Sequence, residues 1–344
     1  MLNNEIYMRR CLQLAKQGLG NVSPNPMVGA VIVAEGKIIG EGFHCCCGQA
    51  HAEVNAINSV KETHLLPHST LFVNLEPCSH YGKTPPCAKL IIEKKIPHVV
   101  VGSLDPFPEV SGRGIKMLKE AGVKVEVGIC QKECDELNKR FFTFHQKKRP
   151  FVLLKFAQSA DGFLAKKGER TPLSTPQTQL LVHKMRSEED AILVGKNTAI
   201  IDNPQLNARC WDLKKNPLRM VIDKNLEIPQ THHLFDNQQP TIVFTQKEST
   251  NSKNLEFVKL DFSKEIIPQI CDFLYQINIQ SLIVEGGKTL LQNFINAQIA
   301  DEVRIEISPN MLHEGIKIPM IKTSVIKEEF LDGNKIITAK PIFY

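Results

Sequence analysis

The sequence predicts two domains of the α/β class. Its 344 residues correspond to two domains at roughly 100 to 200 residues each. In both halves, short β-branched runs alternate with helical stretches, which favours layered sheets with partly parallel strands. A basic run at 147–149 precedes Pro150, and proline is unfavourable in a continuing helix. We interpret the run as a solvated linker and predict domains at residues 1–147 and 148–344.

The first half begins with a helix whose apolar residues recur at helical spacing and which ends near Gly18 and Gly20. A hairpin follows, because two β-branched runs flank Glu35 and Gly36. The predicted elements are helix 5–18, strands 27–34 and 37–43, helix 52–60, strand 70–75, helix 88–94, strand 99–102, helix 114–121, strand 123–127 and one helix over 131–146.

The second half repeats the alternation and has the pattern of a nucleotide-binding sheet. Its polar segment 246–254 is short and predicted to be an exposed loop. The predicted elements are strand 151–157, helix 177–187, strands 191–194, 218–222 and 241–244, helix 266–277, strand 281–284, helix 290–296 and strand 302–307.

Composition and charge exclude several classes of protein. With 42% hydrophobic and 23% charged residues, most of the chain is neither disordered nor a coiled coil. The net charge of +5 is too small for a nucleic-acid binder and suits a small anionic ligand such as a phosphate ester. Charged residues near the start (Glu5, Arg9 and Arg10) and the lack of an apolar run of roughly 18 residues argue against a signal peptide or membrane span. We therefore expect a soluble, cytoplasmic protein.

Ten cysteines in a chain without a secretory signal indicate reduced thiols with some metal ligation. The adjacent Cys45, Cys46 and Cys47 are interpreted as packing or loop thiols, since neighbouring side chains of an extended segment point to opposite faces. The simplest interpretation of five others is a buried thiol: Cys11, Cys130, Cys134, Cys210 and Cys271.

A zinc site is predicted in the first half. His51 is followed by Glu53, and Cys78 and Cys87 come after an intervening strand. One imidazole and two thiolates leave a fourth zinc position for water, the arrangement of a catalytic zinc. Zinc lowers the pKa of such a water toward about 7. Glu53 is then the acid/base that carries a proton from water to a leaving amine, as in nucleobase deaminases.

A purely structural zinc is the alternative interpretation of these residues. It would need a fourth protein ligand, for which His44, Cys45, Cys46 or Cys47 are candidates. A structural site would not explain Glu53, which favours the catalytic interpretation.

Eight residues separate Cys78 from Cys87, whereas two separate the cysteines of the short deaminase signature. The long form PCSHYGKTPPC occurs together with SPNPMVGAVIV at 23–33, GEGFH at 40–44 and HAE at 51–53. This combination resembles the deaminase half of the bifunctional riboflavin-biosynthesis deaminase-reductase family.

The resemblance implies a cytidine-deaminase-like three-layer α/β/α domain that hydrolytically deaminates 2,5-diamino-6-(5-phosphoribosylamino)pyrimidin-4(3H)-one. It implies that zinc is held by His51, Cys78 and Cys87 and that Glu53 is catalytic. The family usually has Asn where this chain has Phe107, so one substrate hydrogen bond is expected to be absent or supplied from elsewhere. The implied substrate-binding residues are Asn25, His44, His80, Lys83 and Asp105.

In the second half, Gly286 and Gly287 lie between a predicted strand and a predicted helix. Glycines at such a helix start let a phosphate approach the backbone, although alone they indicate topology as often as nucleotide binding. The segments KFAQSADG (155–162), VHKMR (182–186), DAILVG (190–195) and TAIIDNPQLNAR (198–209) resemble the reductase half of the same family. The resemblance thus extends over nearly the whole chain.

This half of the family is similar in fold to dihydrofolate reductase, so the resemblance implies a dihydrofolate-reductase-like α/β domain. It also implies reduction of the ribosyl group to ribityl by NADPH. The implied substrate-binding residues are Arg186, Leu206, Arg209 and Glu285, and the implied cofactor-binding residues are Ala157, Thr198, Asp202, Gly286, Gly287 and Thr289.

One segment departs from the family pattern. Where the family commonly has Ser followed by a Trp-Ile-Thr run, this chain has residues 170–174 (RTPLS), and its only tryptophan is Trp211. The cofactor contact that the tryptophan of this run makes in the family is expected to be absent or replaced, so we assign no role to Arg170 or Pro172. Ser174 or Thr175 is expected to cap the following helix.

Two rival functions remain at this point: a zinc deaminase of a free base or nucleic acid with a degenerate second domain, and a non-enzymatic interaction protein stabilised by zinc. The inserted His80 and Lys83, 6% aromatic residues and a weak charge argue against the first, and Glu53 argues against the second. The partners implied are a small phosphoribosyl-pyrimidine substrate, no nucleic acid, no membrane, and a second copy of the chain in a dimer or tetramer joined through the reductase domains.

Overall fold

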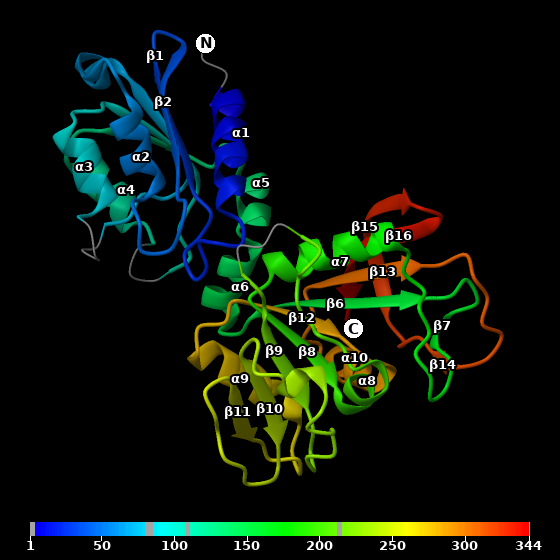
Figure 1. Cartoon of the computed structure of the whole chain (residues 1–344). Coiled ribbons are helices and arrows are strands. Elements are labelled where there is room, and N and C mark those ends of the chain that lie inside the picture. The colour runs from blue at the N-terminus through cyan, green and yellow to red at the C-terminus, as the bar shows by residue number, and fades with distance from the viewer. Residues whose placement is uncertain (1–3, 80–84, 108–110, 212–214, 344) are drawn as a thin grey trace. The chain divides into compact units, whose positions relative to one another are not determined.

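The chain divides between Lys148 and Arg149 in the computed structural model (Figure 1), which describes residues 4–79, 85–107, 111–211 and 215–343. The first unit is Met1–Lys148 and the second is Arg149–Tyr344. This division lies one residue beyond the boundary expected from Pro150.

Within its described residues, the first unit holds a five-stranded sheet of order β2-β1-β3-β4-β5. β1 pairs antiparallel with β2 and β3, whereas β3, β4 and β5 are parallel. The elements are α1 (Asn4–Ala15), β1 (Gly29–Ala34), β2 (Lys37–Phe43), α2 (Ala52–Ser59), β3 (Thr70–Leu75), α3 (Cys87–Glu93), β4 (His98–Ser103), α4 (Arg113–Glu120), β5 (Lys124–Val127), α5 (Gln131–Leu137) and α6 (Lys139–Lys147), with 3-10 turns at Lys16–Gly18 and Thr63–His68.

Both faces of this sheet are covered, which explains why β1 is apolar throughout rather than alternating. Ala30 and Ile32 of β1 pack in the cluster that includes residues of α2, α3 and α4. Val31 and Val33 point to the opposite face and pack in the cluster that includes α1 and Cys134 of α5. The first unit is therefore a three-layer α/β/α structure, as predicted.

The single helix expected over 131–146 is wrong, because the structure has two helices that meet at Asn138. The buried Asn138 side chain accepts a hydrogen bond from the N–H of Met27 (2.8 Å) and donates one to the Met27 carbonyl (2.9 Å). This tertiary contact breaks an otherwise helical pattern, since the Asn138 backbone leaves the helical conformation where its side chain reaches Met27.

The second unit holds, within its described residues, a nine-stranded sheet of order β11-β10-β9-β8-β12-β6-β13-β16-β15. The strands from β11 to β13 are parallel, and β16 and β15 add an antiparallel edge. The elements are β6 (Phe151–Gln158), β7 (Phe163–Ala165), α7 (Pro176–Glu188), β8 (Ala191–Gly195), α8 (Lys196–Asp202), β9 (Leu218–Ile222), β10 (Thr241–Thr245), β11 (Leu255–Lys259), α9 (Ile266–Gln276), β12 (Ser281–Glu285), α10 (Lys288–Asn296), β13 (Glu302–Ile307), β14 (Ile316–Lys317), β15 (Lys322–Leu331) and β16 (Asn334–Ile342), with a 3-10 turn at His233–Phe235.

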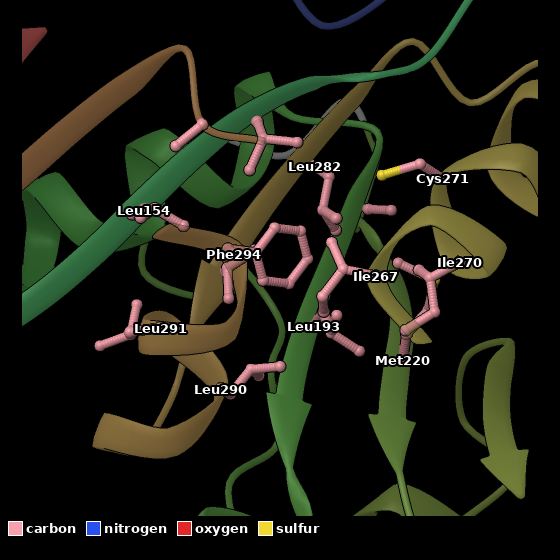
Figure 2. Packing of buried hydrophobic residues seen from close by; sticks show 14 of the residues in the cluster. Leu154, Leu193, Met220, Ile267, Ile270, Cys271, Leu282, Leu290, Leu291 and Phe294 are labelled. Atoms are coloured by element: carbon pink, nitrogen blue, oxygen red, sulfur yellow. The ribbon is translucent and has the colours of Figure 1, made fainter. Parts of the chain in front are cut away.

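Helices cover both faces of the parallel part of this sheet. Figure 2 shows the cluster on one face, where α9 and α10 pack Ile267, Ile270 and Phe294 against Leu154 and Leu282 of the central strands. The other face packs residues of α7 and α8 with alternate residues of the same strands. The predicted α/β class holds for this unit too.

Several details of the second unit differ from the prediction. The helix α8 and the strands β7, β11, β14, β15 and β16 were not predicted; β7, α8, β11 and β14 are short, and β15 is mostly exposed. Arg149 is not part of a solvated linker, because its guanidinium donates to both carboxylate oxygens of Asp301 (2.6 and 2.9 Å) and is largely buried.

Two of the expected buried thiols are also placed differently. Cys210 is exposed and Cys130 is half-buried, whereas Cys11, Cys134 and Cys271 are buried. No helix in the described part of the chain has the length and apolar character needed to cross a membrane.

Candidate functional site

The predicted zinc ligands meet at one end of the first unit's sheet. His51 directly precedes α2, Cys78 follows β3, and Cys87 begins α3. The Sγ atoms of Cys78 and Cys87 lie 3.6 and 3.4 Å from Nδ1 of His51. The backbone N–H of Cys87 also donates to Sγ of Cys78 (3.3 Å). Three residues far apart in the sequence thus point their ligand atoms at one location.

The spacing of these atoms fits zinc. With zinc–sulfur and zinc–nitrogen distances of about 2.3 and 2.0 Å, a tetrahedron places sulfur and nitrogen about 3.5 Å apart. Among the described residues, the group that could hold the ion consists of His51, Cys78 and Cys87, with ligand atoms all within 4.8 Å. None of the alternative fourth ligands named above, His44 and Cys45–Cys47, belongs to this group, so the described part of the chain favours the catalytic form of the site.

Glu53 lies beside the ligand group on the first turn of α2 and is only 3% exposed. Its carboxyl group forms a hydrogen bond with Cys87. Burial and the charge of Cys78 raise the pKa of Glu53 to about 7. A carboxyl group with this pKa can both accept and return a proton near neutral pH.

Asn25 and His44 form a polar pair next to the ligand group. Nδ2 of Asn25 lies 3.1 Å from Nε2 of His44, and Nδ1 of His44 lies 3.1 Å from the carbonyl of Ala50. A neutral ring that donates from Nδ1 and accepts at Nε2 satisfies both contacts, and burial accordingly lowers the pKa of His44. The ring also packs edge-on against His51, with 5.4 Å between centroids.

Asp105 follows β4, the strand next to β3, and is 8% exposed. Its Oδ1 accepts a hydrogen bond from the N–H of Phe107 (2.8 Å), and burial raises the pKa of Asp105 to about 7. The Phe107 ring, at the position that departs from the family, packs on His145 of α6 with 5.0 Å between centroids. Two other expected substrate contacts, His80 and Lys83, lie outside the described residues.

A cavity of about 800 Å³ lies in the second unit, beyond the carboxyl ends of β6, β8 and β12. Ligands of parallel α/β sheets bind at such strand ends. The cavity is lined by all ten residues expected to bind the reductase substrate or cofactor: Ala157, Arg186, Thr198, Asp202, Leu206, Arg209, Glu285, Gly286, Gly287 and Thr289.

Positive charge predominates in this cavity. Among the described lining residues, seven are Lys or Arg (Lys155, Lys166, Arg170, Arg186, Lys196, Arg209 and Lys288), whereas three are acidic (Glu169, Asp202 and Glu285). Such a lining suits a ligand that carries phosphate groups.

The two arginines expected to bind a phosphate differ in their surroundings. Arg186 donates to both carboxylate oxygens of Glu285 (3.0 and 2.7 Å), and both side chains are largely buried. Arg209 donates to Oδ1 of Asn207 (2.8 Å), which leaves its charge uncompensated by that contact. Arg209 is therefore the better placed of the two for an anionic group, and Arg186 holds Glu285 in place.

One backbone hydrogen bond joins two elements of the cavity wall. The N–H of Gly287 donates to Oγ1 of Thr198 (3.0 Å), which ties the start of α10 to α8. Leu206 is 1% exposed and its side chain belongs to the hydrophobic core. Leu206 therefore exposes little surface to a ligand in this structure.

The segment that departs from the family, residues 170–174, also lines the cavity. Its end is anchored by the buried Glu306, whose Oε2 accepts from Ser174 (2.7 Å) and whose Oε1 accepts from Asn334 (2.7 Å). Thr175, not Ser174, caps α7, because Oγ1 of Thr175 accepts from the N–H of Thr178 (3.2 Å).

Comparison with known proteins places both halves of the chain in one family. The family model of the RibD C-terminal domain matches residues 150–321, and that of the cytidine and deoxycytidylate deaminase zinc-binding region matches residues 1–103. The riboflavin biosynthesis protein RibD of Aquifex aeolicus is 39% identical over 327 residues, which are 94% of this chain and 91% of the relative. The chain belongs to the RibD family.

Solved structures extend the similarity to the fold. A Thermotoga maritima protein, described as a diaminohydroxyphosphoribosylaminopyrimidine deaminase/5-amino-6-(5-phosphoribosylamino)uracil reductase, is 37% identical with a TM-score of 0.91, over 98% of this chain and 99% of that one. RibD of Acinetobacter baumannii is 29% identical with a TM-score of 0.90, over 99% of both chains. The predicted family and fold class are confirmed.

Sequence reasoning missed two charged residues of this RibD chain. Lys155 of β6 lines the reductase cavity and interacts electrostatically with Glu285 and Glu306. Glu76 is buried between β3 and Cys78, close to Asp105. Lys155 opens the KFAQSADG segment that carried the resemblance, and Glu76 directly precedes Pro77 and Cys78, so both lay within motifs already singled out.

The Arg186–Glu285 pair predicts a pH-dependent stability of the second unit. Burial alone would raise the pKa of Glu285, but attraction and hydrogen bonds from Arg186 outweigh it and lower this pKa below its ordinary value of 4.5. The stabilisation is therefore present above pH 4.5 and is lost as the pH falls through the lower pKa of the folded state. Glu285→Gln leaves Arg186 without a counter-charge and should cost about 3 kcal/mol at neutral pH.

Urea unfolding followed by the fluorescence of Trp211, the only tryptophan, measures this effect in the second unit. The difference in unfolding free energy between wild type and Glu285→Gln should shrink at acidic pH. Glu248→Gln, at an exposed ion pair with Lys259, is the control and should change stability little. A difference that does not vary with pH would contradict the prediction.

Proposed function

We propose that this RibD protein catalyses two consecutive steps of riboflavin biosynthesis. The first unit, predicted as domain 1–147, would hydrolytically deaminate 2,5-diamino-6-(5-phosphoribosylamino)pyrimidin-4(3H)-one. The second, predicted as domain 148–344, would reduce the ribosyl group of the product to ribityl. The observation that carries the proposal is the buried Glu53 beside a preformed zinc ligand group, in a chain that retains a cationic cavity in its second unit.

In the deaminase unit, His51, Cys78 and Cys87 would hold zinc, which when bound activates water for attack on the ring. Glu53 would take a proton from the water and deliver it to the departing amine. Its burial and its raised pKa support both transfers, because the carboxyl group is not tied to one protonation state near neutral pH.

Substrate would be oriented by polar groups around the ligand group. Asn25 and His44 support one side, where the Asn25 amide and the His44 ring are held by each other and by Ala50. Asp105 would supply a further contact from the end of β4. His80 and Lys83 belong to the same proposal on the strength of the family motif.

In the reductase unit, NADPH would supply the hydride. The Gly287–Thr198 hydrogen bond would hold the start of α10 in place for the cofactor, whose other contacts would be Ala157, Asp202, Gly286 and Thr289. Arg209 would contact the substrate phosphate, while the Arg186–Glu285 pair and the backbone of Leu206 shape the same end of the cavity. The protein's main contribution is orientation of two anionic ligands.

The alternative, a deaminase of a free base or nucleic acid with a degenerate second domain, is not favoured. The family membership extends over both units, and the second unit retains all ten expected cavity residues.

We further propose a cytoplasmic homodimer or homotetramer joined through the reductase units. The edge strand β15 exposes Val325, Ile326 and Phe330 among charged residues, and an exposed edge strand offers unpaired backbone and apolar side chains to a second copy. Light scattering coupled to size exclusion measures this state, and a monomer at micromolar concentration would contradict it.

A paired assay on purified, zinc-loaded protein tests the two activities. Ammonia should be released from the diaminopyrimidine phosphate without cofactor, and NADPH should then be oxidised in proportion to the substrate deaminated. Ammonia without oxidation would confine the function to the first unit. NADPH oxidation only when a deaminated substrate is supplied would confine it to the second.

A further inference from the structure

The side chain of Glu76, directly after β3, is a buried carboxylate that accepts several backbone hydrogen bonds. It is 4% exposed, and it accepts hydrogen bonds from four backbone N–H groups of the described chain. Oε1 accepts from Gly114 (3.0 Å) and Ile115 (3.3 Å). Oε2 accepts from Gly112 (2.9 Å) and Asp105 (3.3 Å). A buried carboxylate is costly unless it is satisfied in this way.

Three of these donors belong to the start of α4. Its N-cap is Gly112, which has no side chain to cap the helix. The first N–H groups of a helix need acceptors, and a negative charge there is favourable. A Ser or Asp at the N-cap would supply such an acceptor locally. Here the acceptor is Glu76, directly after β3, so the position of α4 depends on the segment that leads to Cys78.

The backbone confirms how tightly α4 lies against that segment. A Cβ atom added to Gly114 would lie 2.0 Å from the carbonyl oxygen of Pro77, far inside van der Waals contact. Only glycine permits this approach. Glu76 and Pro77 are therefore held by α4 immediately before the zinc ligand Cys78.

The fourth donor, the backbone N–H of Asp105, links Glu76 to a residue proposed to bind the substrate. Asp105 donates its backbone N–H to Glu76 while its carboxylate accepts from Phe107. β3 and β4 are parallel neighbours, and Leu75 pairs with Ser103. Glu76 thus lies where the chain leading to a metal ligand and the chain leading to a proposed substrate ligand leave the same sheet edge.

We propose that Glu76 is a positioning residue of the deaminase, which fixes Asp105 relative to Cys78 without touching the substrate itself. The inference rests on the proposed deaminase function and on the substrate role of Asp105. Glu76 would therefore contribute to substrate affinity in addition to capping α4.

The test compares Glu76→Gln with wild type in the full chain. Glutamine keeps the size of the side chain, but its Nε2 cannot accept hydrogen bonds and opposes two N–H donors. We expect bound zinc and reductase activity to stay unchanged and deaminase kcat/KM to fall about 100-fold, mainly through KM, because Asp105 is displaced. Glu62→Gln, an exposed change in the same unit, is the matched control.

A double-mutant cycle with Asp105→Asn separates positioning from a general structural role. If Glu76 acts through Asp105, Glu76→Gln should add little to the loss in an Asp105→Asn background. Independent, additive losses would overturn the proposal, as would unchanged KM in Glu76→Gln. A wild-type enzyme that releases no ammonia would instead count against the proposed function.

If Glu76→Gln loses zinc or does not fold, Glu76→Asp takes its place in the cycle. Aspartate keeps the charge but is one methylene shorter, so it cannot reach all four N–H groups. A partial rise in KM that disappears in the Asp105→Asn background supports the proposal. A drop in zinc content with no such coupling overturns it.

Discussion

Glu53→Gln is expected to abolish deamination while leaving the rest of the protein intact. Glutamine fills the same buried space, but it cannot take a proton from water or return one to the amine. Loss of a general acid/base costs roughly 100- to 10,000-fold in rate. Ammonia release should therefore fall by about three orders of magnitude, whereas bound zinc, measured by mass spectrometry, should stay at the wild-type level.

The second unit provides an internal control for this variant. NADPH oxidation with the deaminated substrate should proceed at the wild-type rate, since Glu53 lies in a separate unit with its own core. Glu62→Gln in the first unit should retain both activities. Deamination at the wild-type rate by Glu53→Gln would remove Glu53 from the mechanism.

Cys87→Ser is expected to lose zinc and, with it, deamination by several orders of magnitude, because water is far less reactive without the metal. The thiolate is the ligand that is lost, and a serine hydroxyl replaces it poorly. Reductase activity should be unaffected. Removal of zinc from the wild type by a chelator should give the same pattern, and added zinc should restore deamination to the wild type only.

Cys47→Ser is the matched control, because Cys47 is exposed and lies outside the ligand group. It should bind zinc and release ammonia as the wild type does. Zinc loss in Cys47→Ser together with zinc retention in Cys87→Ser would show that the ligand set is wrong.

The local hydrophobic pattern of the sequence was sufficient to predict most helices and strands. Strands such as Thr70–Leu75, Leu218–Ile222 and Glu302–Ile307 have the predicted bounds, because each is a continuous apolar or alternating run between clear breaks. Prediction failed where a distant contact decides the outcome. The helix predicted over 131–146 is split at Asn138 because its side chain binds Met27, more than a hundred residues away.

The same distinction holds for the sites. The spacing of His51, Glu53, Cys78 and Cys87 was enough to predict a zinc group, since these residue types have few other reasons to occur together. No pattern in the sequence shows that Arg186 is held by Glu285, or that the Leu206 side chain is buried in the core. Those facts depend on which side chains meet after the sheet has formed.

By itself the sequence determined the α/β class, the two halves and the family, and it predicted the metal ligands, because these follow from periodicity, residue chemistry and motif spacing. Tertiary structure alone decided the raised pKa of Glu53 and the contacts of Glu76. Burial raises the pKa of Glu53, and parallel pairing of β3 with β4 brings Glu76 to Asp105. Both effects arise from desolvation and from contacts between distant segments, which exist only in the folded chain.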